Sequence, residues 1–172
     1  MIEYSHISQL AGKKNLWFTN VTRRNRRLEK LGKCFKESVA DMKLDNACVL
    51  DPEAKKTLTS KEAKKFKFFI FGGILGDYPP RKRTKKELTD RIRYKVEKRN
   101  IGKKQMSTDN AVFTVYQIAK GKNMEDLKFI DKLEIPMNRY LTLELPFRYN
   151  LVRGKPYISE ELLRFLRKKK GF

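Results

Sequence analysis

The sequence contains few of the residues that build metal centres and disulfide frameworks. Its 172 residues include one histidine, His6, and two cysteines, Cys34 and Cys48. A structural zinc site needs four nitrogen or sulfur ligands at short spacings, which these three residues do not supply. Two thiols are too few for a disulfide framework, so we expect them to be reduced. The sequence therefore predicts no metal site. His6 lacks a catalytic partner at a recognisable spacing and is interpreted as structural.

Long apolar runs are absent as well, and the first residues do not predict a secretory leader. No hydrophobic stretch approaches the roughly 20 residues that a membrane-spanning helix needs. The first ten residues, MIEYSHISQL, have no basic flank followed by an apolar segment. We therefore expect a cytoplasmic protein without a membrane partner.

Acidic residues are scarce relative to basic ones. Lysine and arginine number 41 against 20 aspartates and glutamates, which gives a formal net charge of +21. Such an excess favours polyanionic partners such as RNA and ribosomes. The alternative explanation is a lysine-rich proteome, in which the surface of every protein would be equally basic. The charge therefore indicates affinity without saying what is done to the bound partner.

The sequence does contain the pattern of one α/β domain over residues 1–172. This length suits a single ordinary domain, and short apolar runs alternate with amphipathic ones. The predicted strands cover 15–21, 46–50, 66–71 and 141–145. The predicted helices cover 28–39, 59–65, 84–99, 107–121 and 159–170.

The first candidate site follows the third predicted strand, in the motif FGGILGDYPPRKRT at 71–84. Glycines expose main-chain N–H and C=O groups with no Cβ to keep a ligand away. Ligands bind at the carboxyl ends of strands in open α/β sheets. The spacing matches neither the dinucleotide fingerprint nor a P-loop. Taken alone, such glycines form a tight turn more often than a ligand site.

Two further motifs are candidates. IGKKQMSTD at 101–109 joins a glycine and a short loop to a polar helix N-terminus, where unpaired N–H groups can bind ligands. Plain helix capping by Ser107 or Thr108 explains it equally well. LPFRY at 145–149 presents two aromatic rings and Arg148 at a strand end. The alternative there is a strand terminator with a surface arginine.

Together and in this order, the three motifs, followed by GKPYISEEL, resemble SPOUT-class methyltransferases. The similarity is to the branch of the arginine methyltransferase that modifies a small-subunit ribosomal protein, and to its archaeal relatives. It extends back through EYSHI, LWFTN and CVLDPEA, so it covers nearly the whole chain. The resemblance implies an α/β fold with helices on both faces of the sheet and a C-terminal deep trefoil knot. Knots are rare exceptions among folds, and periodicity does not reveal them.

The resemblance also implies a cofactor site. In this class, three loops of the knot bind S-adenosylmethionine, largely through main-chain groups, and apolar residues such as Ile74 and Met106 enclose the adenine. Carried over to this chain, the implied cofactor-binding residues are Leu50, Asp51, Pro52, Gly72, Gly73, Ile74, Leu75, Gly76, Ile101, Gly102, Gln105, Met106, Ser107 and Thr108.

Methyl transfer to arginine calls for a carboxylate near the methyl group, because the guanidinium stays protonated at neutral pH. Asp77 is the first candidate, with Asp109 and Glu144 behind it. A turn-stabilising role for Asp77 is an equal alternative. Three arginines are candidates for binding a phosphate or the cofactor carboxylate, or for a structural salt bridge, and the sequence does not choose. They are Arg81, Arg83 and Arg148.

Three functions stay open at this point. Methylation of an arginine in a ribosomal protein is preferred, RNA methylation is the alternative, and a non-catalytic RNA- or ribosome-binding module is the third. Most SPOUT enzymes dimerise, but members of this branch need not do so, and both a homodimer and a monomer are open. Members of the family begin about one strand and half a helix before Met1, so the resemblance implies a short N-terminus.

Overall fold

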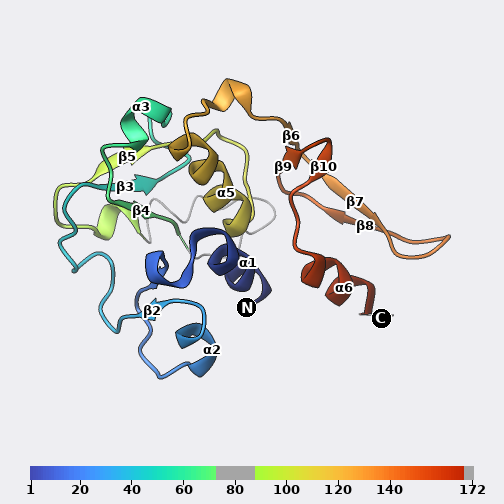
Figure 1. Cartoon of the computed structure of the whole chain (residues 1–172), viewed down its shortest axis with the longest axis horizontal. Coiled ribbons are helices and arrows are strands. Elements are labelled where there is room, and N and C mark those ends of the chain that lie inside the picture. Colours follow the sequence, from blue (N-terminus) through green and yellow to red (C-terminus); the bar gives the residue numbers. More distant parts are fainter. Residues whose placement is uncertain (73–87, 169–172) are drawn as a thin grey trace.

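Three parallel strands form the centre of the molecule (Figure 1). The computed structural model describes residues 1–72 and 88–168. The strand order is β4 (Phe68–Ile70), β3 (Ala47–Leu50) and β5 (Glu97–Arg99). β3 is buried along its whole length, as its continuous apolar sequence predicts for the middle strand of a parallel sheet. Because all three strands run the same way, their carboxyl ends meet at one edge.

Each face of this sheet packs into its own hydrophobic cluster. On one face, Cys48 and Leu50 pack with residues of two helices, α3 (Ser60–Ala63) and α5 (Thr108–Ala119). On the other face, Val49 packs with the segments around 39–44 and 88–96. The mixed α/β fold expected from the sequence is confirmed. In the described residues, the segment at 88–96 that covers this second face is irregular, apart from η2 (Thr89–Arg91), which is a single 3-10 turn.

The helix predicted over 84–99 is wrong in its described part. Residues 88–96 form η2 and irregular chain, and the strand β5 replaces the end of the predicted helix. Leu88, Ile92 and Val96 do face the core, as the pattern required, but from a non-helical backbone. Pairing with β3 therefore outweighs the local helix preference of this charged segment. The capping sequence at 84–87 lies outside the described residues.

The helix predicted over 28–39 is also wrong, apart from its beginning. Only α2 (Arg26–Glu29) forms, capped by the Asn25 side chain, which accepts hydrogen bonds from two backbone N–H groups. The helical turn is followed by Gly32, at a point where the chain passes close to Leu16. A Cβ at this position would lie 2.5 Å from the Leu16 carbonyl oxygen, so the close approach requires glycine. The chain then forms β2 (Lys33–Cys34), parallel to β1 (Trp17–Phe18).

The other expected elements are confirmed with shifted ends. The strands predicted at 46–50 and 66–71 are β3 and β4, and Thr59 caps α3 as its spacing predicted. Ser107 precedes α5, and Gly121, with a φ of 106°, follows it. The predicted strand at 141–145 is β8 (Thr142–Leu145).

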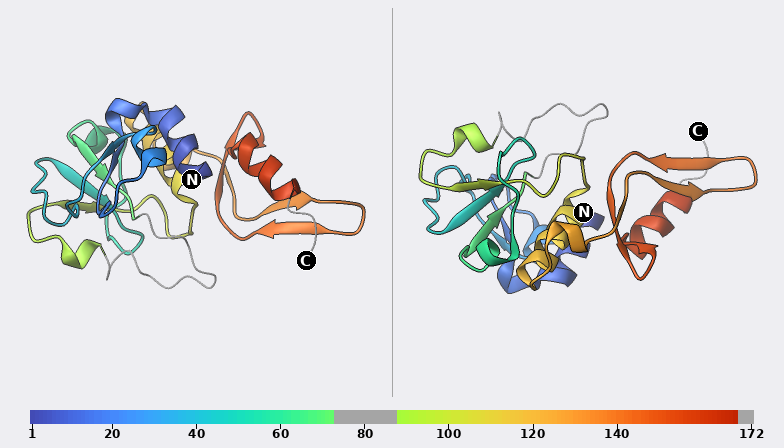
Figure 2. Two further views of the ribbon diagram at one scale, coloured as in Figure 1. Left: turned by 90° about the horizontal axis from the view of Figure 1, so that it is seen from below. Right: turned by 90° about the horizontal axis from the view of Figure 1, so that it is seen from above.

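The rest of the chain adds a helix at the amino end and a separate carboxyl-terminal lobe (Figures 1 and 2). α1 (Ile2–Ala11) packs against α5. A hairpin of β7 (Leu133–Pro136) and β8 projects away from the central sheet. The remaining elements are η1 (Lys13–Asn15), η3 (Met124–Asp126), β6 (Phe129–Ile130), β9 (Tyr149–Val152), β10 (Lys155–Pro156) and α6 (Glu160–Lys168). Among the described helices, none is long and apolar enough to cross a bilayer.

Candidate active site

Hydrogen bonds tie together the loops that leave the carboxyl edge of the sheet. Asp51, which follows β3, is buried, and its carboxylate accepts hydrogen bonds from the Glu53 N–H and, at 2.9 Å, from the Thr89 hydroxyl. Asn100, which follows β5, donates from its amide to the Ala54 carbonyl and accepts from the Gly102 N–H. The loops after β3 and β5 are therefore held in one arrangement, as the predicted site requires.

The loop after β5 meets the motif that contains Arg148. The Arg148 N–H donates to the Gln105 carbonyl at 2.8 Å, and Met106 forms a parallel bridge with Arg148. Gly102 adopts a φ of 96°, a conformation that favours glycine, and a Cβ there would lie 3.6 Å from the Arg148 guanidinium. The structure therefore brings the second and third sequence motifs side by side, although 46 residues separate Gly102 from Arg148 (148 − 102).

The Arg148 guanidinium is already engaged. It donates to Asp131 at 2.6 Å and lies over the Phe129 ring, 5.0 Å from the ring centroid. Hydrogen bonds from Arg148 and Lys104 hold the pKa of Asp131 below its ordinary value. The sequence left three roles open for Arg148: binding a phosphate, binding the cofactor carboxylate, or a structural salt bridge. The structure shows a salt bridge to Asp131, and this salt bridge lies beside the loop at Gly102.

Asp109 lies at the first turn of α5 and is almost fully buried. Its carboxylate accepts hydrogen bonds from the Ser107 hydroxyl at 2.6 Å and the Asn110 N–H, and it pairs with the His6 ring at 2.8 Å. Burial alone would raise the pKa of Asp109, but the hydrogen bonds from His6 and Ser107 outweigh it and hold the pKa below its ordinary value. The carboxylate is thus ionised and fully committed to partners.

His6 is held on its other side by an aromatic ring. It stacks on Tyr157 with ring centroids 4.5 Å apart, and Tyr157 stacks in turn on Phe113 of α5 at 3.8 Å. Burial raises the pKa of Tyr157 to about 12, and the nearby Asp109 carboxylate adds to the shift. The structural interpretation of His6 fits this packing. Its acidic partner was missed because 103 residues separate His6 from Asp109.

A buried amide pair next to Asp109 was also missed. Asn110 and Asn150 are 0% and 1% exposed, and the Asn110 side-chain oxygen accepts from both the backbone N–H and the side-chain amide of Asn150. The Asn110 amide donates to the Tyr157 carbonyl at 3.0 Å, and the Thr114 hydroxyl donates to the Asn150 side chain. This network fastens the start of α5 to β9. No local pattern marks it, because Asn110 and Asn150 are 40 residues apart.

Glu144 does not join this group. It lies on β8 in the projecting hairpin, half exposed, opposite Glu134 of β7. Lys132 bridges the two facing carboxylates, at 2.8 Å from Glu134 and 3.0 Å from Glu144. The like charges opposite each other on the hairpin are thereby compensated.

Several predicted site residues lie outside the described part of the chain. They are Gly73, Ile74, Leu75, Gly76, Asp77, Arg81 and Arg83. Of the described residues in the predicted loops, Leu50, Asp51 and Ile101 are buried, Gly72, Gly102, Gln105, Met106, Ser107 and Thr108 are half-buried, and Pro52 is exposed.

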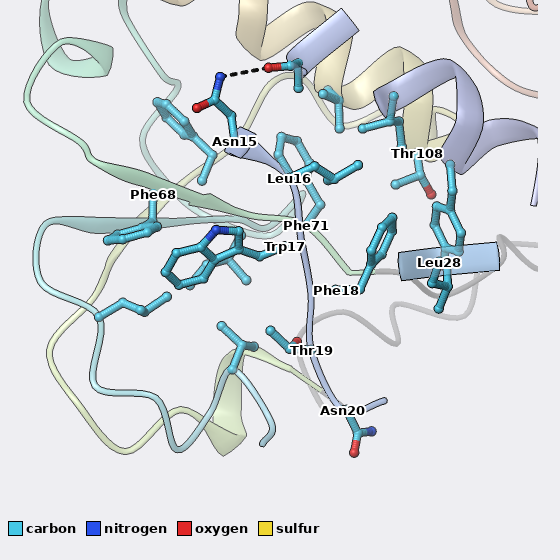
Figure 3. A pocket seen from close by; sticks show the side chains of 18 of the residues that line it. Asn15, Leu16, Trp17, Phe18, Thr19, Asn20, Leu28, Phe68, Phe71 and Thr108 are labelled. Carbon is cyan, nitrogen blue, oxygen red and sulfur yellow. Dashed lines mark hydrogen bonds between the residues drawn. The ribbon is translucent and has the colours of Figure 1, made fainter. Parts of the chain in front are cut away.

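A cavity of about 920 Å³ lies between α1, β1, β4 and α5, and Figure 3 shows its lining. The walls are mainly aromatic and aliphatic, with Trp17, Phe18 and Phe68 among them. Thr108 lines it and belongs to the predicted cofactor residues, whereas the loops after β3 and β5 do not reach it. Within residues 1–72 and 88–168, no group of histidine, cysteine and acidic side chains is arranged to hold a metal ion.

Comparison with known proteins identifies the class to which this fold and these loops belong. The chain matches, over residues 1–171, the family model described as protein arginine N-methyltransferase SFM1-like, and it belongs to that family. It is 38% identical to protein arginine N-methyltransferase SFM1 of Saccharomyces cerevisiae, over 98% of this chain and 87% of the yeast protein. The family expected from the sequence is thereby confirmed.

Solved structures of yeast SFM1 resemble the structure of this chain closely. The complex with SAM (S-adenosylmethionine) superposes with a TM-score of 0.86 at 36% identity, over 97% of this chain and 83% of that one. The complex with MTA gives a TM-score of 0.79 at 34% identity, over 96% of this chain and 91% of that one. These relatives bind the cofactor, or a molecule related to it, that the sequence motifs imply.

Proposed function

We propose that this chain is a protein-arginine N-methyltransferase that uses S-adenosylmethionine and acts on an arginine of a ribosomal protein. The observation that carries the proposal is the convergence of the loops after β3 and β5 at one edge of the sheet. Asn100 joins these loops, and Arg148 closes them from the side. Membership of the SFM1-like family and the SAM-bound relatives support the same reaction.

The proposed cofactor site is the set of loops named from the sequence, at 50–52, 72–77 and 101–108. The described residues fit a ligand bound through main-chain groups. Gly102 has a positive φ and no Cβ on the side that faces Arg148, and Met106 offers a half-buried thioether that accepts from the Thr114 hydroxyl. When bound there, S-adenosylmethionine supplies a methyl group on a sulfonium, activated for in-line displacement. We also propose that one domain over 1–172, with helices on both faces and a C-terminal deep trefoil knot, carries this site.

The base that we propose is Asp77. An arginine guanidinium is protonated at neutral pH, so a carboxylate must orient it and take its proton as the N–C bond forms. The other two candidates are less suited to this role. Asp109 is committed to His6, Ser107 and Asn110, and Glu144 is paired with Lys132 on the hairpin.

The test is to find which molecule receives the methyl group. The purified chain is incubated with methyl-labelled S-adenosylmethionine and separately with ribosomal proteins and ribosomal RNA. We expect label in protein, recovered as methylarginine after hydrolysis. Label in RNA alone would support the second candidate, an RNA methyltransferase, which the net charge of +21 favours. No label and no cofactor binding would leave the non-catalytic binding module.

A further inference from the structure

A segment near the amino end of the chain carries a high concentration of exposed positive charge. Residues 22–36, which contain α2 and β2, are called the basic arm here; in Figure 1 they form the blue segment below the central sheet. The arm carries seven cations and one carboxylate, Glu29, which gives +6 (7 − 1). The cations are all exposed: Arg23, Arg24, Arg26, Arg27, Lys30, Lys33 and Lys36.

Within the described residues, little of this charge is neutralised by acidic side chains. Arg24 pairs with Glu29 at 3.4 Å, with both side chains largely exposed, and such a pair contributes little. Lys33 lies over the Trp17 ring, 5.9 Å from its centroid. Among residues 1–72 and 88–168, the arm's other cations have no ion-pair partner. They therefore repel one another, and a polyanion bound from outside would relieve that repulsion.

A few cations elsewhere in the described chain do have acidic partners. Arg99 pairs with both Glu62 and Glu97, and Lys132 with two glutamates of the hairpin. The arm differs from these sites because its seven exposed cations share a single carboxylate, Glu29.

The arm is held in place at both ends. The N–H groups of Asn20 and Val21 donate to the carbonyls of Glu37 and Phe35, and the Ser8 hydroxyl donates to the Leu31 carbonyl at 2.6 Å. Leu28 points its side chain into the cavity shown in Figure 3. The cations are thus presented on an anchored loop, which lowers the conformational entropy lost when they bind.

The composition of the arm identifies its partner chemistry. Four of its cations are arginines, whose planar guanidinium groups bind phosphate oxygens through paired hydrogen bonds. Membrane binding by a basic segment also uses exposed apolar side chains, and none of the large exposed hydrophobic residues of the described chain lies in the arm. No exposed aromatic ring is present there for stacking on bases, so recognition falls on the sugar–phosphate backbone.

We propose that the basic arm binds the phosphate backbone of RNA, with little sequence preference, as a docking surface separate from the site of methyl transfer. The arm borders the cavity through Arg23 and Leu28, and Phe71, next to the proposed cofactor turn, lines the same cavity. The inference does not depend on the methyl-transfer proposal, because RNA binding and cofactor binding are measured separately.

The test is fluorescence anisotropy with a labelled RNA stem-loop, titrated at several salt concentrations. The variant Arg23→Gln/Arg24→Gln/Arg26→Gln/Arg27→Gln removes four exposed charges. We expect it to bind RNA at least about tenfold more weakly than the wild type, with a salt slope lower by about three. The matched control is Lys55→Gln/Lys56→Gln/Lys64→Gln/Lys65→Gln, which removes the same charge from exposed positions around α3. We expect that control to keep most of its affinity.

Three results would overturn the proposal. The wild type does not bind the stem-loop, the two quadruple variants lose equal affinity, or polyglutamate or anionic vesicles compete for the arm as well as RNA does. Calorimetric titration with S-adenosylmethionine separates this outcome from the proposed function. An arm variant that binds the cofactor like the wild type, and has an unchanged melting temperature, has lost the RNA surface alone.

Discussion

The start of α5 and the β7–β8 hairpin both carry asparagines and carboxylates, but these side chains are held in opposite ways. At α5, Asp109, Asn110 and Asn150 are buried, and each makes several hydrogen bonds to fixed partners. On the hairpin, Glu134 and Glu144 lie in solvent and share one lysine. A polar group that is buried and bonded fixes geometry, and its removal leaves orphaned partners, whereas an exposed ion pair is screened. We therefore expect the functional site to lie near the start of α5 and not on the hairpin.

The largest expected effect separates the proposed base, Asp77, from the carboxylates of the hairpin. We expect Asp77→Asn to lower kcat for methyl transfer by about 100-fold or more, because the amide cannot take the guanidinium proton. Glu144→Gln on the hairpin is the matched control, and its kcat is expected to stay within about twofold of the wild type. Both are measured with labelled S-adenosylmethionine. A large loss in the hairpin variant with none in Asp77→Asn would reverse the assignment of the base.

A smaller effect separates the two asparagine environments in stability. Asn110→Ala removes the side-chain partner of the Asn150 backbone N–H and of the Tyr157 carbonyl, so we expect a loss of about 3 kcal/mol in the free energy of unfolding. The hairpin control is Asn138→Ala, which removes two exposed hydrogen bonds to the Tyr140 and Leu141 N–H groups. We expect it to cost about 0.5–1 kcal/mol. Urea denaturation measures both, and equal losses would contradict the comparison.

The next effect is a pH dependence at Asp109. Its pKa in the folded protein is below the ordinary value, so the stability it contributes is complete above a pH of about 4. That stability is lost as the pH falls through the folded pKa. We expect Asp109→Asn to be less stable than the wild type at pH 7 by about 1–2 kcal/mol. The difference should shrink as the pH falls below about 4, and a constant difference between pH 7 and pH 3 would show that the ionised carboxylate is not responsible.

The smallest effect concerns the hairpin ion pairs. We expect Lys132→Gln to change the melting temperature little, because Glu134 and Glu144 are about half exposed and are screened by salt. Its matched partner is Arg99→Gln, at 8% side-chain exposure, which leaves Glu62 and Glu97 without their shared cation. Differential scanning calorimetry compares them, and a larger shift for Lys132→Gln would contradict the distinction between buried and exposed polar groups.

The sequence reveals those parts of the molecule that have local signals. The continuous apolar run at 46–50 predicts β3, and Ser107 and Gly121 mark the two ends of α5. Residues 88–99 show where local signals fail, because their helical spacing is kept while pairing with β3 makes 97–99 a strand. The pairs His6–Asp109 and Asn110–Asn150 form only when distant segments pack, so no pattern in the sequence marks them.

The central claim, a cofactor site at the carboxyl edge of the sheet, is tested most directly with two glycines. Gly102 and Gly121 both have positive φ, 96° and 106°, so alanine costs each a similar backbone strain of roughly 1–2 kcal/mol. Only Gly102 belongs to the proposed cofactor loops. We predict that the wild type and Gly121→Ala bind S-adenosylmethionine in calorimetric titrations with nearly equal affinity, while Gly102→Ala binds at least about tenfold more weakly. Equal affinities for the two variants, or no binding by the wild type, would contradict the account.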